Sequence, residues 1–448
     1  MREAYDPASA TYAIRDTMKR LSRATSVAIS VAVVAIASVP AHGAVCNPRD
    51  RGAKADGITK DTAAIQACID AVSIPGSGAL ESKQYGRVVL SGGTFLSAPI
   101  RLQRGVDLRI EKGAILLASP DRRDFPHWRF TDKDTVQPFI STVNTEYVSI
   151  TGEGIIDGNG QVWWDYVRNV PDSGTLGTDH PRPMGVLFDH SRHIRMQGVT
   201  LQNSGFWQIV PYYSDDVILR GIRILAPRSP NTDAIDPFSS SNVVIDQVFS
   251  SVGDDNIAIK SGAINSPGPD APSRNITITD CTFESGHGLS IGSEIAGGVQ
   301  NVHAERIHFR GTDQGIRIKS ARDRGNDVSD ITFKDIVMED VKTAILVTEY
   351  YPHPVPQAEV APEPVRRLTP KFHDITLENV TARNSGSAGY IVGLPESPVL
   401  DLKLKNVHLQ GHTGLSIAYA TLTLDDVTVK AETGQDIVIA PTAHVTRK

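Results

Sequence analysis

Four short polar motifs in the middle of the chain together hold the side chains of an acid/base site. They are Asn231-Thr-Asp233, Gly253-Asp-Asp255, Gly286-His-Gly288 and Arg317-Ile-Lys319. Their three carboxylates, one imidazole and two cations would gather if the segments that carry them stack on one another. Because clustered carboxylates repel, at least one is expected to have a raised pKa and to hold a proton near neutral pH. Such a set suits proton transfer on an anionic substrate.

A repeated pattern of alternating apolar and polar residues supplies segments that can stack. Each repeat has an apolar, a polar and an apolar residue, then two mostly polar residues and another apolar one. Alternation indicates β-strands, and a period in the twenties is typical of a solenoid. Val, Ile and Thr dominate, as strands prefer. The first apolar residues of the repeats are Ile194, Val217, Val243, Ile276, Val302, Ile331, Ile375, Leu402 and Leu422.

These repeats predict an all-β fold, a single-stranded parallel β-helix. No helical heptads separate them, so the crossovers are expected to be loops. The structural rival, a sandwich of antiparallel hairpins, would need regular tight turns such as Asn-Gly, which the repeats lack. Residues 60–73 have apolar side chains at helical spacing, with Asp61 or Thr62 as N-cap, and are expected to form a short N-terminal capping helix. The proline-rich residues 352–370 are expected to form an exposed loop.

The motifs recur at a similar phase of the repeat. Asp254 and His287 each follow the first apolar residue of their repeat by 11 positions, whereas Asn231 and Arg317 follow theirs by 14 and 15. Neighbouring coils of a β-helix lie about 4.8 Å apart. Similar phase therefore predicts that the motif side chains line one face. Lys319 is two residues after Arg317, so both cations are expected to leave the same strand face, where they could clamp a substrate carboxylate.

Taken singly, each motif has a simpler structural explanation. Asn-Thr-Asp is often a turn, and Asp-Asp is often a solvated loop or, in a β-helix, a calcium site. A histidine between glycines is often only a turn residue, and Arg-Ile-Lys is often an exposed strand face. Four such coincidences at nearly one phase of four consecutive repeats are less expected than a shared site. A protonated carboxyl beside ionised ones would suit glycoside hydrolysis, in which one carboxyl protonates the leaving oxygen and another activates water.

The N-terminus is typical of an export signal. A basic stretch precedes the almost uncharged segment 24–41, and small residues follow it. Cleavage is predicted before Ala44, which gives a signal peptide over residues 1–43 (Met18 is an alternative initiator) and one mature domain over residues 44–448. The alternative, an uncleaved membrane anchor, is disfavoured because the apolar segment is barely long enough to span a bilayer. We therefore expect a secreted or periplasmic monomer without stable membrane association.

Charge and cysteines narrow the classes of partner and cofactor. The formal net charge is −6 and no basic stripe is present, so nucleic acid is not expected as a partner. Cys46 and Cys68 lie near the mature N-terminus and could form a disulfide, which export permits. Cys281 occupies an apolar strand position and is expected to be a buried thiol. None of the cysteines has metal-ligand spacing, so neither a zinc nor an iron–sulfur site is expected.

The motif set resembles glycoside hydrolase family 28, the polygalacturonase family. The segment Asp280–Ser293 fits the signature around that family's histidine, and the other three motifs follow in the same order and spacing. The resemblance implies a right-handed β-helix and a single-displacement inverting mechanism without a cofactor or metal. It implies Asp254 as general acid, Asp233 and Asp255 as bases that activate water, His287 as the residue that maintains the acid, and Asn231, Arg317, Lys319 and Tyr351 (or Tyr350) as substrate-binding residues.

The resemblance also implies an acidic plant polysaccharide as the partner. Rhamnogalacturonan hydrolases generally lack the His-Gly and Arg-Ile-Lys pair found here, which favours polygalacturonan or pectin cleaved at α-1,4-galacturonosidic bonds. Long segments at residues 120–185, with Trp163-Trp164, and 352–370 could wall the groove, which favours exo-action. The alternatives are an endo-polygalacturonase, a rhamnogalacturonan hydrolase, a calcium-dependent pectate lyase and a non-catalytic polysaccharide-binding β-helix.

Overall fold

The computed structural model describes residues 43–130, 133–169, 180–226, 230–262, 271–357 and 360–448. Apart from Gly43, the predicted signal peptide lies outside the described residues, as does the alternative start Met18. No helix in this part of the chain is long and apolar enough to cross a membrane.

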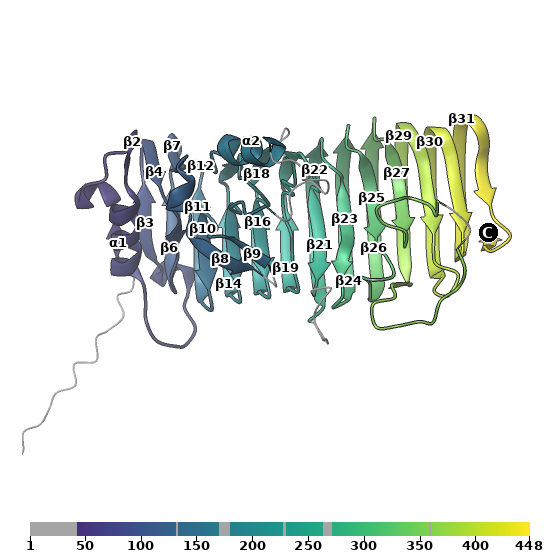
Figure 1. Cartoon of the computed structure of the whole chain (residues 1–448), viewed down its shortest axis with the longest axis horizontal. Helices are drawn as coiled ribbons and strands as arrows, with labels where there is room; N and C mark the ends of the chain where they lie inside the picture. Colours follow the sequence, from purple (N-terminus) through teal and green to yellow (C-terminus); the bar gives the residue numbers. More distant parts are fainter. Residues whose placement is uncertain (1–42, 131–132, 170–179, 227–229, 263–270, 358–359) are drawn as a thin grey trace, which may run out of the picture. The chain divides into compact units, whose positions relative to one another are not determined.

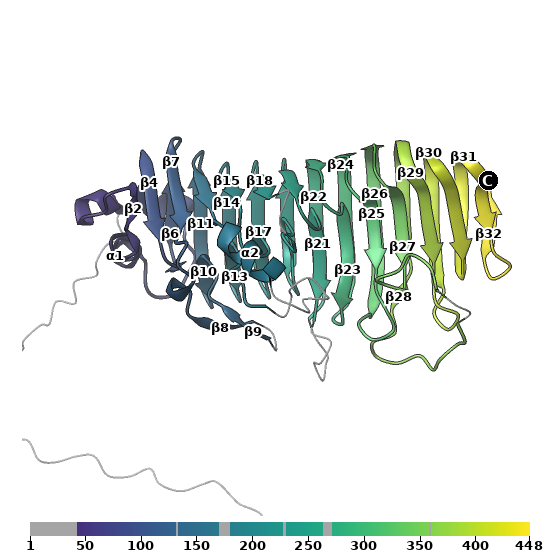
Figure 2. The same ribbon diagram turned by 45° about the horizontal axis from the view of Figure 1, so that its top comes forward.

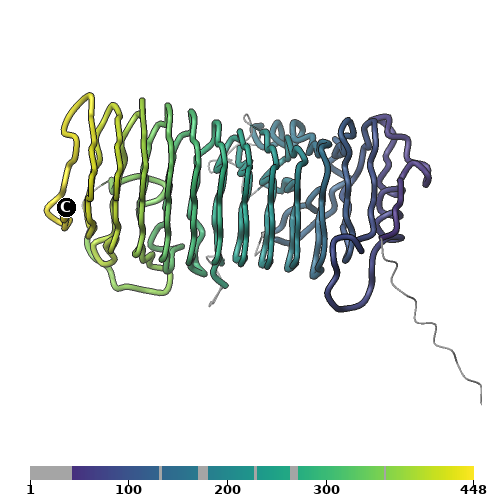
Figure 3. The backbone as a smooth tube through the Cα atoms, turned by 180° about the vertical axis from the view of Figure 1, so that it is seen from behind, coloured from purple at the N-terminus to yellow at the C-terminus, as the bar shows by residue number. Residues whose placement is uncertain are grey.

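The described chain is a parallel β-helix whose coils stack through three lanes of strands (Figures 1 and 3). The first apolar residues of the predicted repeats lie in direct register in the first lane. Each pairs with its counterpart on the next coil, in the order Ile194, Val217, Val243, Ile276, Val302, Ile331, Ile375, Leu402 and Leu422. The predicted stacking of the repeats is therefore confirmed.

The strands are assigned to lanes by their pairing. The first lane contains β1 (Val45–Cys46), β3 (Gly86–Leu90), β6 (Val106–Ile110), β11 (Glu146–Gly152), β14 (Arg192–Gln197), β17 (Asp215–Arg220), β19 (Ser241–Asp246), β28 (Lys371–Phe372) and β32 (His444–Arg447). The second lane contains β2 (Asp56–Lys60), β4 (Gly93–Ser97), β7 (Ala114–Ala118), β12 (Ile155–Asp157), β15 (Thr200–Gln202), β18 (Arg223–Ala226) and β20 (Phe249–Val252). The third lane contains β5 (Ile100–Arg101), β10 (Ile140–Val143), β13 (Val186–Asp189), β16 (Ile209–Tyr212), β21 (Ile257–Ser261), β23 (Leu289–Ile295), β25 (Gln314–Lys319) and β27 (Thr343–Thr348).

Towards the C-terminus the strands lengthen and bend from one lane into the next. The first and second lanes are joined in β22 (Ser273–Glu284), β24 (Val299–Arg310) and β26 (Asp327–Glu339). All three lanes are joined in β29 (Ile375–Val392), β30 (Val399–Ala418) and β31 (Ala420–Ile439). Short 3₁₀ turns lie at Pro48–Arg51, Ser82–Gln84 and Arg122–Asp124.

A residue with positive φ forms a bend just before the first apolar residue of every predicted repeat except the last, which starts at Leu422. Asn and Asp tolerate this conformation better than other non-glycine residues. They also stack along the solenoid, since Asn275 Nδ2 donates to Asn242 Oδ1 at 3.0 Å and Asn301 Nδ2 donates to Asn275 Oδ1 at 2.8 Å. The bends at this position include Asn242, Asn275, Asn301, Asp330, Asp374 and Asp401.

The predicted capping helix is confirmed as α1 (Thr62–Val72), which covers the N-terminal end of the core (Figure 1). Its own Ile65 and Ile69 are fully buried against the core. Asp61 is the N-cap, but its carboxylate accepts from the amides of Lys54 and Ala55 rather than from the helix. A disulfide joins Cys46 to Cys68 in this helix, and Cys281 is buried and free, as expected for both.

The expectation that all crossovers are loops is wrong for α2 (Gln161–Asn169), which lies between β12 and β13. Trp163, Trp164 and Val167 share the buried side of this short helix. Trp163 is 1% exposed and Trp164 is 7% exposed, so both indoles pack against the protein and neither faces a passing polymer. A single pair of buried aromatic residues in a polar segment is too short a pattern to signal a helix.

Two other insertions leave the coils. An antiparallel hairpin, β8 (His127–Phe130) and β9 (Lys133–Val136), lies beside β10 and β13 (Figure 2). The proline-rich insertion follows β27, and its described residues are mostly exposed, as expected. Arg322 fastens it through an ion pair with Glu363 and another with Glu396.

Candidate active site

The four motifs lie on successive coils around the start of the third lane. Three motif residues occupy equivalent places on three consecutive coils, because each stands two residues before a position that pairs with the next coil. They are Asp233, Asp255 and His287. These paired positions are Ile235, Ile257, Leu289 and Ile316.

The predicted phase was wrong by one residue at His287. A count of 11 from each repeat start aligned this imidazole with Asp254, but the pairing of Ile257 with Leu289 aligns it with Asp255. The cause is a difference in the length of chain between the first and third lanes. The segment from Ile276 to Leu289 is one residue shorter than the segment from Val243 to Ile257. The two carboxylates are adjacent in the chain, so both remain beside the ring.

The glycines around His287 allow its turn to lie directly against the neighbouring coils. Gly286 and Gly288 have φ of +92° and +77°, a region that side chains disfavour. A Cβ at Gly288 would stand 2.1 Å from the Gln314 carbonyl oxygen, and one at Gly286 would stand 2.5 Å from the Asp254 carbonyl oxygen. The amide of His287 donates to that same Asp254 oxygen at 2.8 Å. The glycines therefore bring the imidazole into the site.

Asp255 is held as a carboxylate by two cations. Its Oδ1 accepts from Ser290 Oγ at 2.8 Å and from Arg317 Nη1 at 3.0 Å, and its Oδ2 accepts from Lys319 Nζ at 2.7 Å. The side chain is 1% exposed. Burial raises its pKa, but the charges of Lys319 and Arg317 outweigh burial and hold the pKa well below the usual range. Asp255 is therefore ionised at all working pH values.

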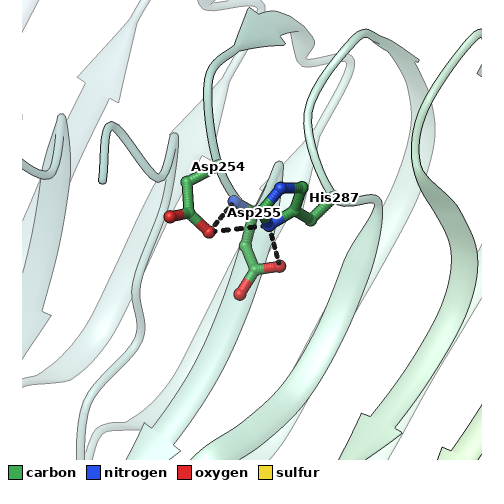
Figure 4. A group of neighbouring side chains, drawn as sticks. All are labelled: Asp254, Asp255 and His287. Atoms are coloured by element: carbon green, nitrogen blue, oxygen red, sulfur yellow. Dashed lines mark hydrogen bonds and ion pairs between the residues drawn. The ribbon is translucent and has the colours of Figure 1, made fainter. Parts of the chain in front are cut away.

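Asp254 and His287 form a second pair (Figure 4). His287 Nδ1 lies 2.9 Å from Asp254 Oδ1 and 3.9 Å from Asp255 Oδ1. Burial raises the pKa of Asp254, but the hydrogen bond with His287 lowers it below its usual value. Burial lowers the pKa of His287, and the bond and charge of Asp254 more than reverse this. The pair thus holds one proton between the two pKa values, and the directions of the shifts place it on the imidazole, hydrogen-bonded to Asp254.

Asn231 lies next to this pair. Its Nδ2 donates to Asp254 Oδ2 at 3.3 Å, and its own Oδ1 accepts from Arg182 Nη2 at 2.9 Å. Arg182, 1% exposed, also donates to the Pro230 carbonyl oxygen at 2.8 Å. It was not predicted, because it lies outside the repeats.

Asp233 has the raised pKa expected of a clustered carboxylate. Burial is the main cause, and the nearby charges of Asp236 and Asp254 add to it. Asp233 Oδ2 lies 3.8 Å from Lys260 Nζ, whose charge partly opposes the shift. The expectation of at least one raised carboxyl pKa is met by Asp233 and Asp236, whereas Asp254 and Asp255 are lowered.

The aromatic ring of Tyr351 closes the cationic side of the site. It lies 5.8 Å from the Arg317 guanidinium carbon and 5.2 Å from Lys319 Nζ, both measured to the ring centroid. The Tyr351 amide donates to the Ser320 carbonyl oxygen at 3.0 Å, which places the ring. The hydroxyl of Tyr350 is buried and has no hydrogen-bond partner among the described residues. Of the two tyrosines, Tyr351 is thus the one beside the predicted cations.

Lys260 and Glu294 are charged neighbours that the sequence reading missed. Lys260 Nζ lies 3.4 Å from Glu294 Oε2 and 5.1 Å from the centre of the Trp207 ring. A signal for Lys260 was present: Ile257-Ala-Ile-Lys-Ser261 repeats the pattern of Ile316-Arg-Ile-Lys-Ser320. Lysines at the same position of two coils indicate one outward-facing cationic stripe.

A metal ion does not suit this arrangement, although ligand atoms of Asp254, Asp255 and His287 all lie within 4.8 Å of one another. Both oxygens of Asp255 already accept bonds from cations. A divalent ion would have to displace or repel Arg317 and Lys319. The chemistry of the site is therefore assigned to its side chains.

Asp236 offers a test of this buried electrostatics. Its side chain is fully buried, and neither oxygen has a hydrogen-bond partner among the described residues. Its pKa is raised chiefly by burial. In unfolded protein this carboxyl ionises at lower pH than in folded protein, so wild-type stability falls as pH rises through that interval. Asp236→Asn cannot ionise and so does not show this loss. The unfolding free energy of the variant minus that of wild type should therefore increase by about 1–3 kcal/mol as the pH is raised from 4 to 8.

Denaturant unfolding of both proteins across that pH range measures the gain. A constant difference between wild type and Asp236→Asn at every pH would show that Asp236 does not titrate with folding.

The comparisons with known proteins agree with the fold. The model of glycosyl hydrolases family 28 matches residues 92–432. A probable polygalacturonase of Vitis vinifera is 31% identical over 80% of this chain and 72% of its own. An endo-polygalacturonase of Pectobacterium carotovorum subsp. carotovorum is 30% identical over 77% of this chain and 85% of its own. The crystal structure of an exopolygalacturonase from Thermotoga maritima superposes with a TM-score of 0.73 at 26% identity, covering 88% of this chain and 93% of that one.

The chain is a glycoside hydrolase built on a right-handed parallel β-helix. It belongs to glycosyl hydrolases family 28, because the family model covers most of its length. The predicted family and fold are both confirmed.

Proposed function

We propose that this protein hydrolyses α-1,4-galacturonosidic bonds of polygalacturonan and pectin by an inverting mechanism. The observation that carries the proposal is the division of labour among the carboxylates. Asp254 shares a proton with His287, while Asp255 is kept ionised by Arg317 and Lys319. An acid and a base in one site are what single-displacement glycoside hydrolysis requires.

The steps follow from where the protons lie. Asp254 donates the shared proton to the glycosidic oxygen as the bond from that oxygen to the anomeric carbon breaks. Water attacks the same carbon from the opposite face and gives its proton to the carboxylate pair of Asp233 and Asp255, which orients it. Because burial raises the pKa of Asp233, this base becomes protonated and activity falls on the acid side. Loss of the proton shared by Asp254 and His287 ends activity on the alkaline side.

The charge balance favours an acidic sugar. Arg317 and Lys319 together bring two positive charges against the single carboxylate of Asp255, so one positive charge remains for a uronate carboxylate. Lys260 adds another cation one coil away from His287. Asn231, Arg317, Lys319 and Tyr351 are the proposed substrate-binding residues.

Exo-action is supported by what covers the third lane on the N-terminal side of the site. Outward-facing positions of this lane run in register through Leu187, Val210, Asp236, Ala258, Ser290 and Arg317. At the first two positions the row is apolar, and Leu187 and Val210 are fully buried under Phe130 of the β8–β9 hairpin and Met184. This cover supports a groove that is obstructed along the lane in that direction. We propose that one end of the substrate chain lies near Trp207.

The predicted export signal supports a location of this reaction outside the cytoplasm. We propose a secreted or periplasmic monomer that meets its substrate there, with cleavage of the signal before Ala44.

Product analysis tests the proposal. The purified protein is incubated with polygalacturonate and, separately, with rhamnogalacturonan, and the products are resolved over time. We expect saturated mono- or digalacturonate from polygalacturonate from the earliest samples, released with inverted anomeric configuration, and the same rate in the presence of a chelator.

Each rival has its own outcome in this assay. A ladder of oligomers at early times would show endo-action, and cleavage of rhamnogalacturonan alone would identify the other backbone. Unsaturated products that disappear with chelator would identify a lyase. The absence of any product would favour a non-catalytic, polysaccharide-binding β-helix.

A further inference from the structure

A row of six polar side chains runs along the solenoid and has the proposed acid near its centre. Each member contacts the next through a hydrogen bond or an ion pair, and the charged members alternate in sign outward from Asp254 towards the C-terminus. We call this set the polar row; it consists of Arg182, Asn231, Asp254, His287, Asp313 and Lys342.

His287 is held from both sides in this row. Nδ1 faces Asp254 Oδ1 at 2.9 Å, and Nε2 faces Asp313 Oδ2 at 3.5 Å. A half-turn of the imidazole about its Cβ–Cγ bond would point carbon atoms at both carboxylates. Two carboxylates on opposite edges of the ring therefore select one orientation, whereas Asp254 alone would fix only one edge.

The backbone fixes Asp313 where it can do this. Its amide donates to the Gly286 carbonyl oxygen at 2.7 Å, and its carbonyl oxygen accepts from the Thr343 amide at 2.9 Å. Lys342 Nζ lies 2.5 Å from Asp313 Oδ1, so the carboxylate divides its charge between the lysine and the imidazole. The Lys342 amide donates to the Thr312 carbonyl oxygen at 3.1 Å, and its side chain is 75% exposed. Changing the lysine side chain therefore leaves the coil intact.

We propose that Asp313 is a positioning residue for the hydrolysis, which holds the His287 ring opposite Asp254, and that Lys342 sets how strongly it does so. The kinetic part of this inference rests on the proposed function, and the structural part does not. Four charged groups face the ring: Asp254, Asp255, Asp313 and Arg317, with Lys342 acting through Asp313. Of these, Asp313 can be altered without touching the proposed acid or base.

The two outer residues should change His287 in opposite directions. Asp313→Asn removes a negative charge beside the imidazolium, so the pKa of His287 should fall. Lys342→Met frees the Asp313 carboxylate, so that pKa should rise. Each shift should be about 0.3–1 pH unit, since the pair is partly exposed and screened, and should shrink at high salt.

The experiment is an NMR titration of the full-length protein with ¹³C-labelled histidine. His287→Gln identifies the resonance, and Asp280→Asn is the matched control, since Asp280 is an exposed carboxylate paired with Arg306 on another lane. Opposite shifts in the two variants, with none in the control, would support the inference. An unchanged titration in Asp313→Asn, or shifts of the same sign in both variants, would overturn it.

The pH–rate profile gives a second, separate readout. The alkaline limb should move to lower pH in Asp313→Asn and to higher pH in Lys342→Met, with kcat changed more than KM, and Asp313→Glu should restore part of the rate. If wild type does not hydrolyse polygalacturonate, the proposed function fails while the NMR titration still decides the role of Asp313. If wild type is active but neither the titration nor the limb moves, only the inference fails.

Discussion

Asp254→Asn is expected to lower kcat on polygalacturonate by two to four powers of ten, on the usual scale of general acid catalysis, with little change in KM. The amide keeps the size of the carboxyl group, and its single oxygen can still accept from Asn231 or from His287, but it has no acidic proton for the glycosidic oxygen. Initial rates of reducing-end release over a range of substrate concentrations measure both constants.

The leaving group distinguishes a lost acid from a disturbed site. An aryl galacturonide with an acidic phenol needs little protonation of its leaving oxygen, so Asp254→Asn should lose far less activity on it than on polygalacturonate. A loss of the same size on both substrates would assign Asp254 to another role, and a loss below tenfold on the polymer would remove it from the mechanism.

A matched carboxylate elsewhere supplies the control. Asp280 has positive φ, which Asn also tolerates, and lies in an exposed pair with Arg306. Asp280→Asn should therefore leave kcat within about twofold of wild type, since surface pairs contribute little.

The coils could be predicted from the sequence because their information is local. Each repeat must turn its apolar residues inward, so the pattern itself fixes both strand and register. Asn and Asp before most of the first apolar residues, as at Asn242 and Asp330, then provide the bends. The capping helix carried the same kind of local signal in its 3.6-residue spacing.

The site could be predicted only as far as it follows the repeat. The motif residues came together, and the one-residue error at His287 arose from a turn whose length no strand pattern records. Lys260 could also have been predicted, because Ile257–Ser261 repeats the Ile-x-Ile-Lys-Ser pattern of Ile316–Ser320.

The remaining features depend on contacts between segments far apart in the chain. Arg182 reaches Asn231 from an insertion, and Phe130 covers Val210 from a hairpin some 80 residues away in the sequence. Neither contact has a periodic signature, because each depends on where an insertion folds back onto the solenoid. In the proposed function the hairpin limits how a polymer can enter, so the direction of attack could not be derived from the motifs.

The second large effect is expected at Asp255, where activity and stability should be lost together. Asp255→Asn leaves Arg317 and Lys319 buried, 10% and 5% exposed, without their counter-charge. Removing one partner of a buried ion pair typically lowers the free energy of unfolding by about 3–5 kcal/mol. Burial and Arg317 already lower the pKa of Lys319, and removing the Asp255 carboxylate should lower it further. Denaturant unfolding at pH 7 measures the loss, and kcat should fall by at least about two powers of ten because one of the two proposed bases is gone.

The pH dependence of the loss has a definite sign. The folded-state pKa of Asp255 is depressed, so its contribution is fully present above the unfolded pKa and disappears as pH falls through the folded one. The stability difference between wild type and Asp255→Asn should therefore shrink as pH is lowered from about 5 towards 2. A difference that stays constant over this range would mean that the carboxylate charge is not what stabilises the site.

A double substitution separates the two roles of Asp255. Adding Lys319→Met to Asp255→Asn removes one uncompensated buried charge and replaces it with an apolar chain of similar length, so part of the stability should return. Activity should not return, because neither the base nor the uronate-binding cation is restored. Recovery of both would reduce Asp255 to a counter-ion for Lys319, and Asp233 would then be the single base of the mechanism. Recovery of stability alone assigns Asp255 to both tasks: it neutralises the cations that bind the substrate while directing the attacking water.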